Sequence, residues 1–137
     1  MPSLSSFEGG CLCGAIRYRA AGQPVVRSLC HCHSCRLAAG APTVAWVVWR
    51  SSDFSWVHGA PSEYASSPGV TRTFCNHCGT PLTYQKNAER GTIDVTTATH
   101  DAADEFAPTM EIWTEEKLRW ECVNPQLPQH PRSSRDS

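Results

Sequence analysis

The sequence lacks several features that would place it in a specialised class of protein. No apolar run approaches the roughly 20 residues that a membrane-spanning helix requires. Neither sign of charge is in excess, because 12 lysines and arginines stand against 13 aspartates and glutamates, for a formal net charge of −1. We therefore expect no binding to nucleic acid and none to an anionic membrane surface. The 137 residues suffice for one modest hydrophobic core and not for two.

Both ends of the sequence lack the patterns of folded structure. Residues 1–10 have neither the basic start nor the apolar stretch of a secretory signal, so we expect a cytoplasmic protein whose thiols are kept reduced. Residues 124–137 contain three prolines followed by polar residues. We expect a domain over residues 7–123, with a flexible N-terminus at 1–6 and a flexible proline-rich tail at 124–137.

Helical periodicity is also scarce, and short apolar runs between turn residues predict strands instead. The predicted strands are 15–19, 43–50, 53–57, 70–74, 82–84, 92–97 and 118–123. Helix is expected only as one or two turns at 35–39 and at 114–117. This pattern predicts a mainly β fold, an antiparallel sandwich or partly open barrel. Most of the five tryptophans should lie in its core, and one or two are candidates for lining a pocket.

Eight cysteines stand out against this ordinary composition, and seven of them fall into three tight groups. The groups are Cys11 with Cys13, Cys30 with Cys32 and Cys35, and Cys75 with Cys78; Cys122 stands alone. Thiols one or two residues apart suit a metal ion better than disulfides, which would close long loops. The sequence therefore predicts zinc rather than a disulfide framework.

The three groups divide naturally between two metal sites. The two pairs together supply four thiolates, a closed set that predicts a structural zinc held by Cys11, Cys13, Cys75 and Cys78. Such a site contributes folding free energy on the order of 10–16 kcal/mol, by analogy with zinc-finger peptides. Gly14 and Gly79 each follow the second cysteine of a pair, where glycine allows a tight turn beside the metal and a positive φ if the turn needs one.

The remaining group, Cys30, Cys32 and Cys35, supplies only three thiolates. A tetrahedral ion then keeps one open position, which is typical of a catalytic or ligand-exchanging zinc and favours an incoming thiolate. The alternative is a closed site whose fourth ligand is one of His31, His33, His77 and Cys122. The residues alone leave both open.

The cysteine segments resemble the family of glutathione-dependent formaldehyde-activating (GFA) enzymes, a domain also found in centromere protein V. The resemblance rests on residues 9–18 (GGCLCGAIRY), 30–36 (CHCHSCR) with Gly40-Ala41, and 72–82 (RTFCNHCGTPL). A weaker likeness follows at Ile93-Asp-Val-Thr and from Ile112-Trp113 to Trp120. All seven grouped cysteines fall on the family's positions, over roughly residues 7–123.

The resemblance implies curled antiparallel sheets with little helix, a structural zinc on the two pairs and a second, labile zinc on the group of three. It also implies a carbon–sulfur lyase that adds glutathione to formaldehyde to give S-hydroxymethylglutathione. The chain departs from the family at Ala39, often serine or threonine there, and at His100-Asp101, often leucine and aspartate. Either position is a candidate for altering the substrate pocket.

Several further residues are candidates for roles in such a reaction. Arg36 directly follows the group of three, and Arg17 and Arg72 flank the other two groups, so all three are candidates by position for contacting a glutathione carboxylate. For Arg17 and Arg72 we favour the alternative of exposed strand arginines. The candidate proton donors are His31, His33, His77 and His100.

Two other functions remain open on the sequence. A small β-domain can use zinc only as a staple and bind a protein or small ligand without catalysis. A redox sensor would form a reversible disulfide among Cys30, Cys32 and Cys35 and would need the second metal to be absent.

Overall fold

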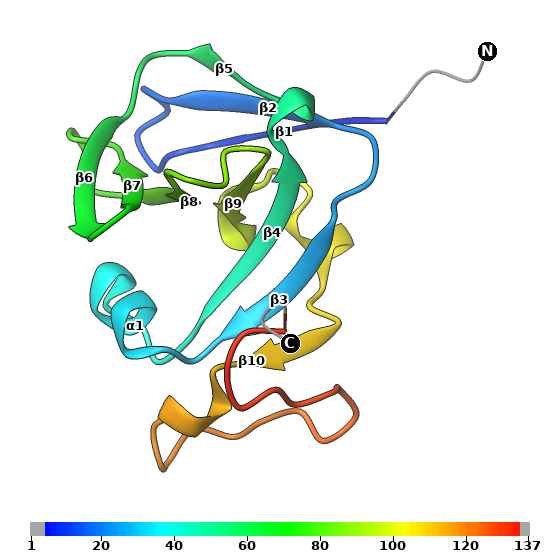
Figure 1. Ribbon diagram of the computed structural model, residues 1–137. Helices are drawn as coiled ribbons and strands as arrows, with labels where there is room; N and C mark the ends of the chain where they lie inside the picture. The colour runs from blue at the N-terminus through cyan, green and yellow to red at the C-terminus, as the bar shows by residue number, and fades with distance from the viewer. Residues whose placement is uncertain (1–4, 135–137) are drawn as a thin grey trace.

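The computed structural model of the chain describes residues 5–134 and consists mainly of strands in two sheets (Figure 1). The small sheet has the order β1-β2-β5 and is antiparallel; its strands are β1 (Ser6–Gly10), β2 (Arg17–Ala21) and β5 (Phe54–His58). The large sheet has the order β10-β3-β4-β9-β8-β7-β6. Its strands are β3 (Val26–Cys30), β4 (Val44–Arg50), β6 (Ser62–Ser67), β7 (Val70–Phe74), β8 (Pro81–Lys86), β9 (Thr92–Thr96) and β10 (Met110–Ile112). The mainly β fold is confirmed.

Helices are few and short, as the sequence predicts. The single α-helix of the described residues is α1 (His33–Ala39). The 3-10 turns are η1 (Ser51–Asp53), η2 (Thr97–Thr99), η3 (Ala103–Phe106) and η4 (Thr114–Glu116). Across residues 5–134, every helix is too short or too polar to span a lipid bilayer.

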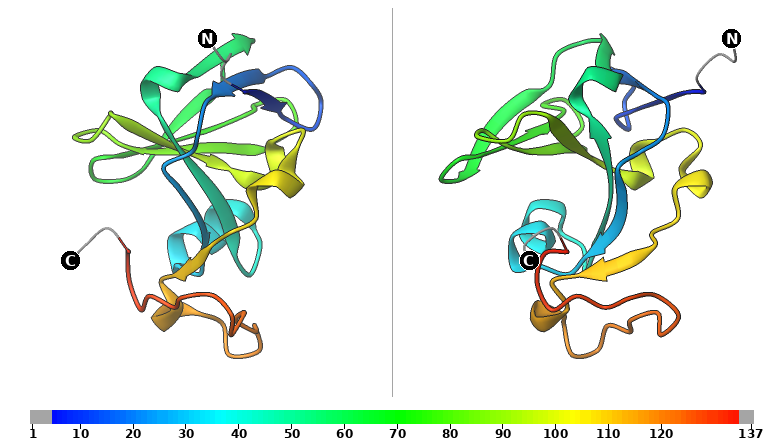
Figure 2. Two further views of the ribbon diagram at one scale, coloured as in Figure 1. Left: turned by 90° about the vertical axis from the view of Figure 1, so that its right-hand side faces the viewer. Right: turned by 45° about the vertical axis from the view of Figure 1, so that its right-hand side comes forward.

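The large sheet is strongly curled, and this curvature creates two levels in the molecule. In Figures 1 and 2 the small sheet lies over the β7–β8–β9 part, whereas β3, β4 and β10 extend away and carry α1 at their far end. Within the large sheet every pairing is antiparallel except that of β10 beside β3. Neither sheet closes on itself, so the fold is an open one.

The main core lies between the two sheets. Tyr18 of the small sheet packs with Val47, Trp49 and Val95 of the large sheet, and all four side chains are fully buried. The strand predicted at 43–50 is β4, and it is buried on both faces, as its continuous apolar run indicates. A second cluster forms at the far end around Cys30, Cys35, Val44 and Trp46.

The strand predicted at 118–123 is wrong, because this segment is a loop with a turn at residues 119–120. The Lys117 ammonium donates to the carbonyl oxygens of Leu118 (3.0 Å) and Glu121 (2.8 Å). In a strand these two carbonyl oxygens would instead accept hydrogen bonds from the backbone of a neighbouring strand. Trp120 accordingly points outward and is 70% exposed.

The segment after Val123 returns along β10 within the described residues. A bridge pairs Glu111 with Gln129, and the backbone N–H groups of Trp113 and Thr114 donate to the carbonyls of Arg132 and His130. This part of the chain therefore contacts the domain that we expected to end at residue 123. The flexibility expected of both termini stays a prediction, and residues 1–4 and 135–137 lie outside the described part.

Candidate functional site

Two hairpin turns bring the first four cysteines together. Cys11 and Cys13 lie between β1 and β2, and Cys75 and Cys78 lie between β7 and β8; all four sulfurs are within 4.8 Å of one another. The Sγ atoms of Cys11 and Cys13, and those of Cys13 and Cys75, are 3.7 Å apart. A tetrahedron with zinc–sulfur bonds of about 2.3 Å has edges of about 3.8 Å, so the donor set fits zinc.

The backbone of both turns is arranged around this four-cysteine group. Gly14 and Gly79 have φ values of 81° and 79°, so both turns use the positive φ that glycine permits. The backbone N–H groups of Ile16 and His77 donate to the sulfurs of Cys11 (3.3 Å) and Cys75 (3.4 Å). Such bonds favour thiolates over thiols, which is the protonation state that a metal requires.

The three remaining grouped cysteines meet where β3 leads into α1. Cys30 ends β3, Cys32 is the N-cap of α1, and Cys35 lies in its first turn. Their sulfurs lie within 4.8 Å of one another, and within the described chain this three-cysteine group contains no histidine or carboxylate. Three soft donors on one side of a cavity suit an ion with one open position.

The three cysteines of this group differ in the direction in which their surroundings shift the thiol pKa. Hydrogen bonds from the thiols of Cys30 and Cys32 lower the pKa of Cys35 against the effect of burial, and the nearby Arg72 guanidinium lowers it further. The pKa of Cys30 is raised, because its thiol donates to the other two sulfurs and because it is buried. The neighbouring Arg72 guanidinium therefore favours the thiolate form of Cys35.

A cavity of about 250 Å³, here called the cysteine pocket, opens onto this group. It is lined by aromatic and charged side chains from several elements: Trp46, Arg72, Tyr84, Lys86, Asp94, Trp113 and Glu116. Apart from the tryptophans and Arg72, these residues carry no motif in the sequence and were not predicted. They meet here because β4, β7, β8 and β9 are neighbours in the sheet.

Arg72 is not the exposed strand arginine that we expected. Its Nη2 is 3.8 Å from Cys35 Sγ, its Nε donates to Ser66 Oγ (3.1 Å), and its guanidinium lies 4.9 Å from the centre of the Tyr84 ring. The curl of the sheet, which no local pattern reports, turns β7 toward α1. Arg36 is not among the residues that line the cysteine pocket. Its Nε is buried and has no hydrogen-bond partner among residues 5–134.

The histidines lie in very different places. His33 and His77 are exposed, whereas His100 is buried and distant from the three-cysteine group. Trp49 Nε1 donates to His100 Nε2 (3.1 Å), and His100 Nδ1 lies 3.1 Å from the carbonyl oxygens of Thr96 and Thr97. Burial lowers the pKa of His100, so it is a neutral core residue.

His31 is fully buried and does not belong to the group formed by the sulfurs that flank it in sequence. Its Nε2 is 2.6 Å from Glu111 Oε1, and Glu111 is itself fully buried. Burial opposes ionisation of Glu111, but hydrogen bonds from His31, the Asn124 N–H and Gln129 hold its pKa below the usual range. The pair ties the cysteine loop to β10 and to the returning C-terminal segment.

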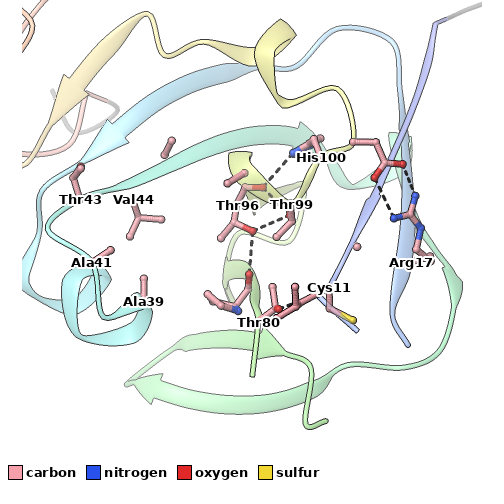
Figure 3. Close-up of a pocket in the computed structure, with 16 residues that line it drawn as sticks. Cys11, Arg17, Ala39, Ala41, Thr43, Val44, Thr80, Thr96, Thr99 and His100 are labelled. Carbon is pink, nitrogen blue, oxygen red and sulfur yellow. Dashed lines mark hydrogen bonds and ion pairs between the residues drawn. The ribbon is translucent and has the colours of Figure 1, made fainter. Parts of the chain in front are cut away.

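A larger cavity of about 560 Å³ is lined by Ala39 at the end of α1 and by residues of the segment 96–101 (Figure 3). It contains both positions at which the sequence departs from the GFA pattern, Ala39 and His100-Asp101, and Figure 3 shows Arg17 paired with Asp101 at one end. None of its described lining residues belongs to the three-cysteine group. These departures therefore lie outside the cysteine pocket.

Comparison with known proteins gives one family and a few relatives. The family model described as glutathione-dependent formaldehyde-activating enzyme matches residues 6–116. An uncharacterized lyase of Schizosaccharomyces pombe is 35% identical over 79 residues, which are 58% of this chain and 57% of that protein. A Halomonas elongata protein named for glutathione-dependent formaldehyde activation is 34% identical over 85 residues, 56% of this chain and 54% of that protein. The matches thus span little more than half of these relatives.

A solved structure has the same fold. The crystal structure of a Rhodobacter sphaeroides protein superposes with a TM-score of 0.57 at 21% sequence identity, covering 89% of this chain and 98% of that one. At this identity the likeness concerns the arrangement of the strands and not the activity.

Proposed function

The chain belongs to the family of glutathione-dependent formaldehyde-activating enzymes, and from this premise we propose that it is a zinc-dependent carbon–sulfur lyase. Its reaction would be the addition of glutathione to formaldehyde to give S-hydroxymethylglutathione. The reverse reaction would split this adduct into glutathione and formaldehyde. The observation that carries the proposal is the three-cysteine group, which gains no fourth ligand from residues 5–134 and opens into a pocket. A lyase name among the relatives supports the same class of reaction.

The two cysteine groups would have different roles. Four sulfurs form a closed set, so Cys11, Cys13, Cys75 and Cys78 would hold a structural zinc that joins the small sheet's hairpin to the large sheet. Cys30, Cys32 and Cys35 would hold the second ion. When bound there, zinc acts as a Lewis acid that keeps a substrate thiol deprotonated at neutral pH.

The protein's own side chains would bind and orient the thiol partner. Glutathione carries two carboxylates and one ammonium group, and the cysteine pocket offers both signs of charge: Arg72 and Lys86, and Asp94 and Glu116. Arg72 lies beside Cys35, so it is placed to fix a carboxylate next to the reacting sulfur. Trp46 and Trp113 form apolar walls that exclude water from the carbonyl carbon.

The proposed reaction balances without a redox partner. The thiolate sulfur gives an electron pair to the aldehyde carbon and forms the C–S bond, while the C=O π electrons move to oxygen, which takes one proton. The reverse breaks the same C–S bond. Positioning the two reactants is the main contribution that we assign to the pocket.

The test is zinc content per chain, measured before and after dialysis with excess glutathione, together with exchange of the glutathione–formaldehyde adduct followed by NMR. We expect two zinc ions that fall to one while the circular dichroism spectrum is kept, and adduct exchange faster than the uncatalysed rate. Two ions that both resist glutathione, with no rate enhancement, would instead support a zinc-stapled binding domain. A single zinc ion from the outset, with a reversible disulfide in the three-cysteine group, would support a redox sensor.

Arg72→Ala should raise KM for the glutathione adduct about 10-fold or more, because a hydrogen bond to a charged group contributes about 1.5–3 kcal/mol. Zinc content should be unchanged, and Arg72→Lys should lie between the two. The control is Arg90→Ala, at an exposed position outside the pocket lining. An unchanged KM for Arg72→Ala would remove this role, and Arg36→Ala in the same assay tests the contact that the sequence suggested.

A further inference from the structure

A third cavity adjoins the cysteine pocket and differs from it in charge. It measures about 570 Å³ and is lined by the apolar side chains of Leu37 and Ala38 of α1, Tyr64 of β6, Phe74 of β7 and Pro81 of β8, together with the uncharged polar side chains of Ser66, Thr73 and Thr83. We call this cavity the apolar trough. Ser34, Trp46 and Arg72 line both cavities, so the trough begins at the wall of the cysteine pocket.

The charged residues divide sharply between the two cavities. Lys86, Asp94 and Glu116 line the cysteine pocket alone, and the only charged residue in the described lining of the trough is Arg72, at the boundary. Leu37 and Tyr64 are 69% and 63% exposed, which leaves apolar surface in water beside the proposed site. An apolar group bound there would remove this surface from water, a favourable change of roughly 25 cal/mol for each Å².

From this division we propose that the apolar trough holds the substituent of an aldehyde larger than formaldehyde. The inference rests on the proposed function and specifies its substrate class: thiol adducts of aldehydes that carry an aromatic or branched apolar group. The charged cysteine pocket holds the glutathione part, and the apolar group on the adduct carbon passes Trp46 into the trough. Formaldehyde has no substituent and leaves a cavity of this size unused.

The chemistry is that of the proposed reaction with a different group on the carbon. The thiolate sulfur and the aldehyde carbon form or break one C–S bond, and the carbonyl oxygen gains or loses one proton. Both directions need only the thiol and the aldehyde.

Binding can be tested without turnover, with stable thioethers on the zinc-containing protein as purified. We expect S-benzylglutathione to bind at least about 10-fold more tightly than S-methylglutathione by titration calorimetry, because the benzyl group buries more apolar area. Ala38→Trp fills the trough from an exposed helix position and should abolish this preference. The matched control is Ala88→Trp: Ala88 is also exposed, but it lies in the turn between β8 and β9, outside the lining of both the trough and the cysteine pocket.

Turnover of two adducts separates this inference from the proposed function. We expect catalysed exchange of both the formaldehyde and the benzaldehyde adduct of glutathione, with Ala38→Trp slowing only the latter. Exchange of the formaldehyde adduct together with equal binding of the two thioethers would overturn the trough proposal and leave the proposed function standing. A benzyl preference that Ala38→Trp removes, without catalysed exchange of either adduct, would uphold the trough as a binding site and overturn the lyase.

Discussion

Cys75→Ser is expected to unfold the protein under conditions in which the parent chain is fully folded. Cys75 is completely buried in the main core and is one of the four sulfurs that meet between the β1–β2 and β7–β8 turns. Structural zinc contributes on the order of 10–16 kcal/mol, which matches or exceeds the entire stability of a domain, about 5–15 kcal/mol. Loss of one ligand should therefore remove both the ion and the fold.

Thermal unfolding by circular dichroism and zinc content per chain check this expectation. Cys122→Ser is the matched control, because Cys122 is exposed and belongs to neither cysteine group. We expect Cys122→Ser to keep the parent's Tm and zinc content. If Cys75→Ser melted at the same temperature with the same zinc content, the four-cysteine group would not be a structural metal site.

Cys35→Ser should have the opposite profile, a loss of catalysis with the fold retained. Cys35 is the sulfur of the three-cysteine group whose ionisation its neighbours favour most, and it lies beside Arg72. Without it the second ion has two protein ligands, so zinc per chain should fall from two to one. Adduct exchange should fall at least about 100-fold, because a Lewis acid that stabilises developing charge is worth several kcal/mol.

The same variant distinguishes an active site from a staple. If Cys35→Ser melts close to the temperature of the parent protein, the metal site that stabilises the fold is the four-cysteine group alone. Catalysis that persists in Cys35→Ser with one remaining zinc would contradict the assignment of the reaction to the three-cysteine group. Cys122→Ser again serves as the control for replacing a thiol with a hydroxyl.

Much of the metal chemistry follows from the sequence because ligands close in sequence must also be close in space. The spacing of Cys11 with Cys13 and of Cys75 with Cys78 fixes each pair on one tight turn, and counting sulfurs then pairs the two turns. The structure confirms that these four sulfurs meet and that Cys30, Cys32 and Cys35 form a separate group. Glycine at positions 14 and 79 permits the positive φ that the structure has there.

The strands show where the local sequence pattern fails to predict secondary structure. β4 was predicted because its run is apolar without interruption, whereas β3 (Val26–Cys30) and β6 (Ser62–Ser67) were missed because polar residues break their alternation. The segment 118–123 has strand-like composition but no neighbouring strand, and the ammonium of Lys117 holds it as a turn. A strand is stabilised by its pairing partners, which a single segment does not reveal.

What the sequence alone determined is the identity and grouping of the sulfurs and the mainly β character of the chain. What only the tertiary structure decided is everything that surrounds the second group. The curl of the large sheet turns Arg72 toward Cys35, the buried Glu111 pairs with His31, and the cysteine pocket shares a wall with the apolar trough. The physical reason is the distance along the chain over which each feature is set. The cysteines of one group lie within a few residues of one another, so their sequence spacing already brings them together. The pocket is formed by side chains from strands that become neighbours only when the sheet forms.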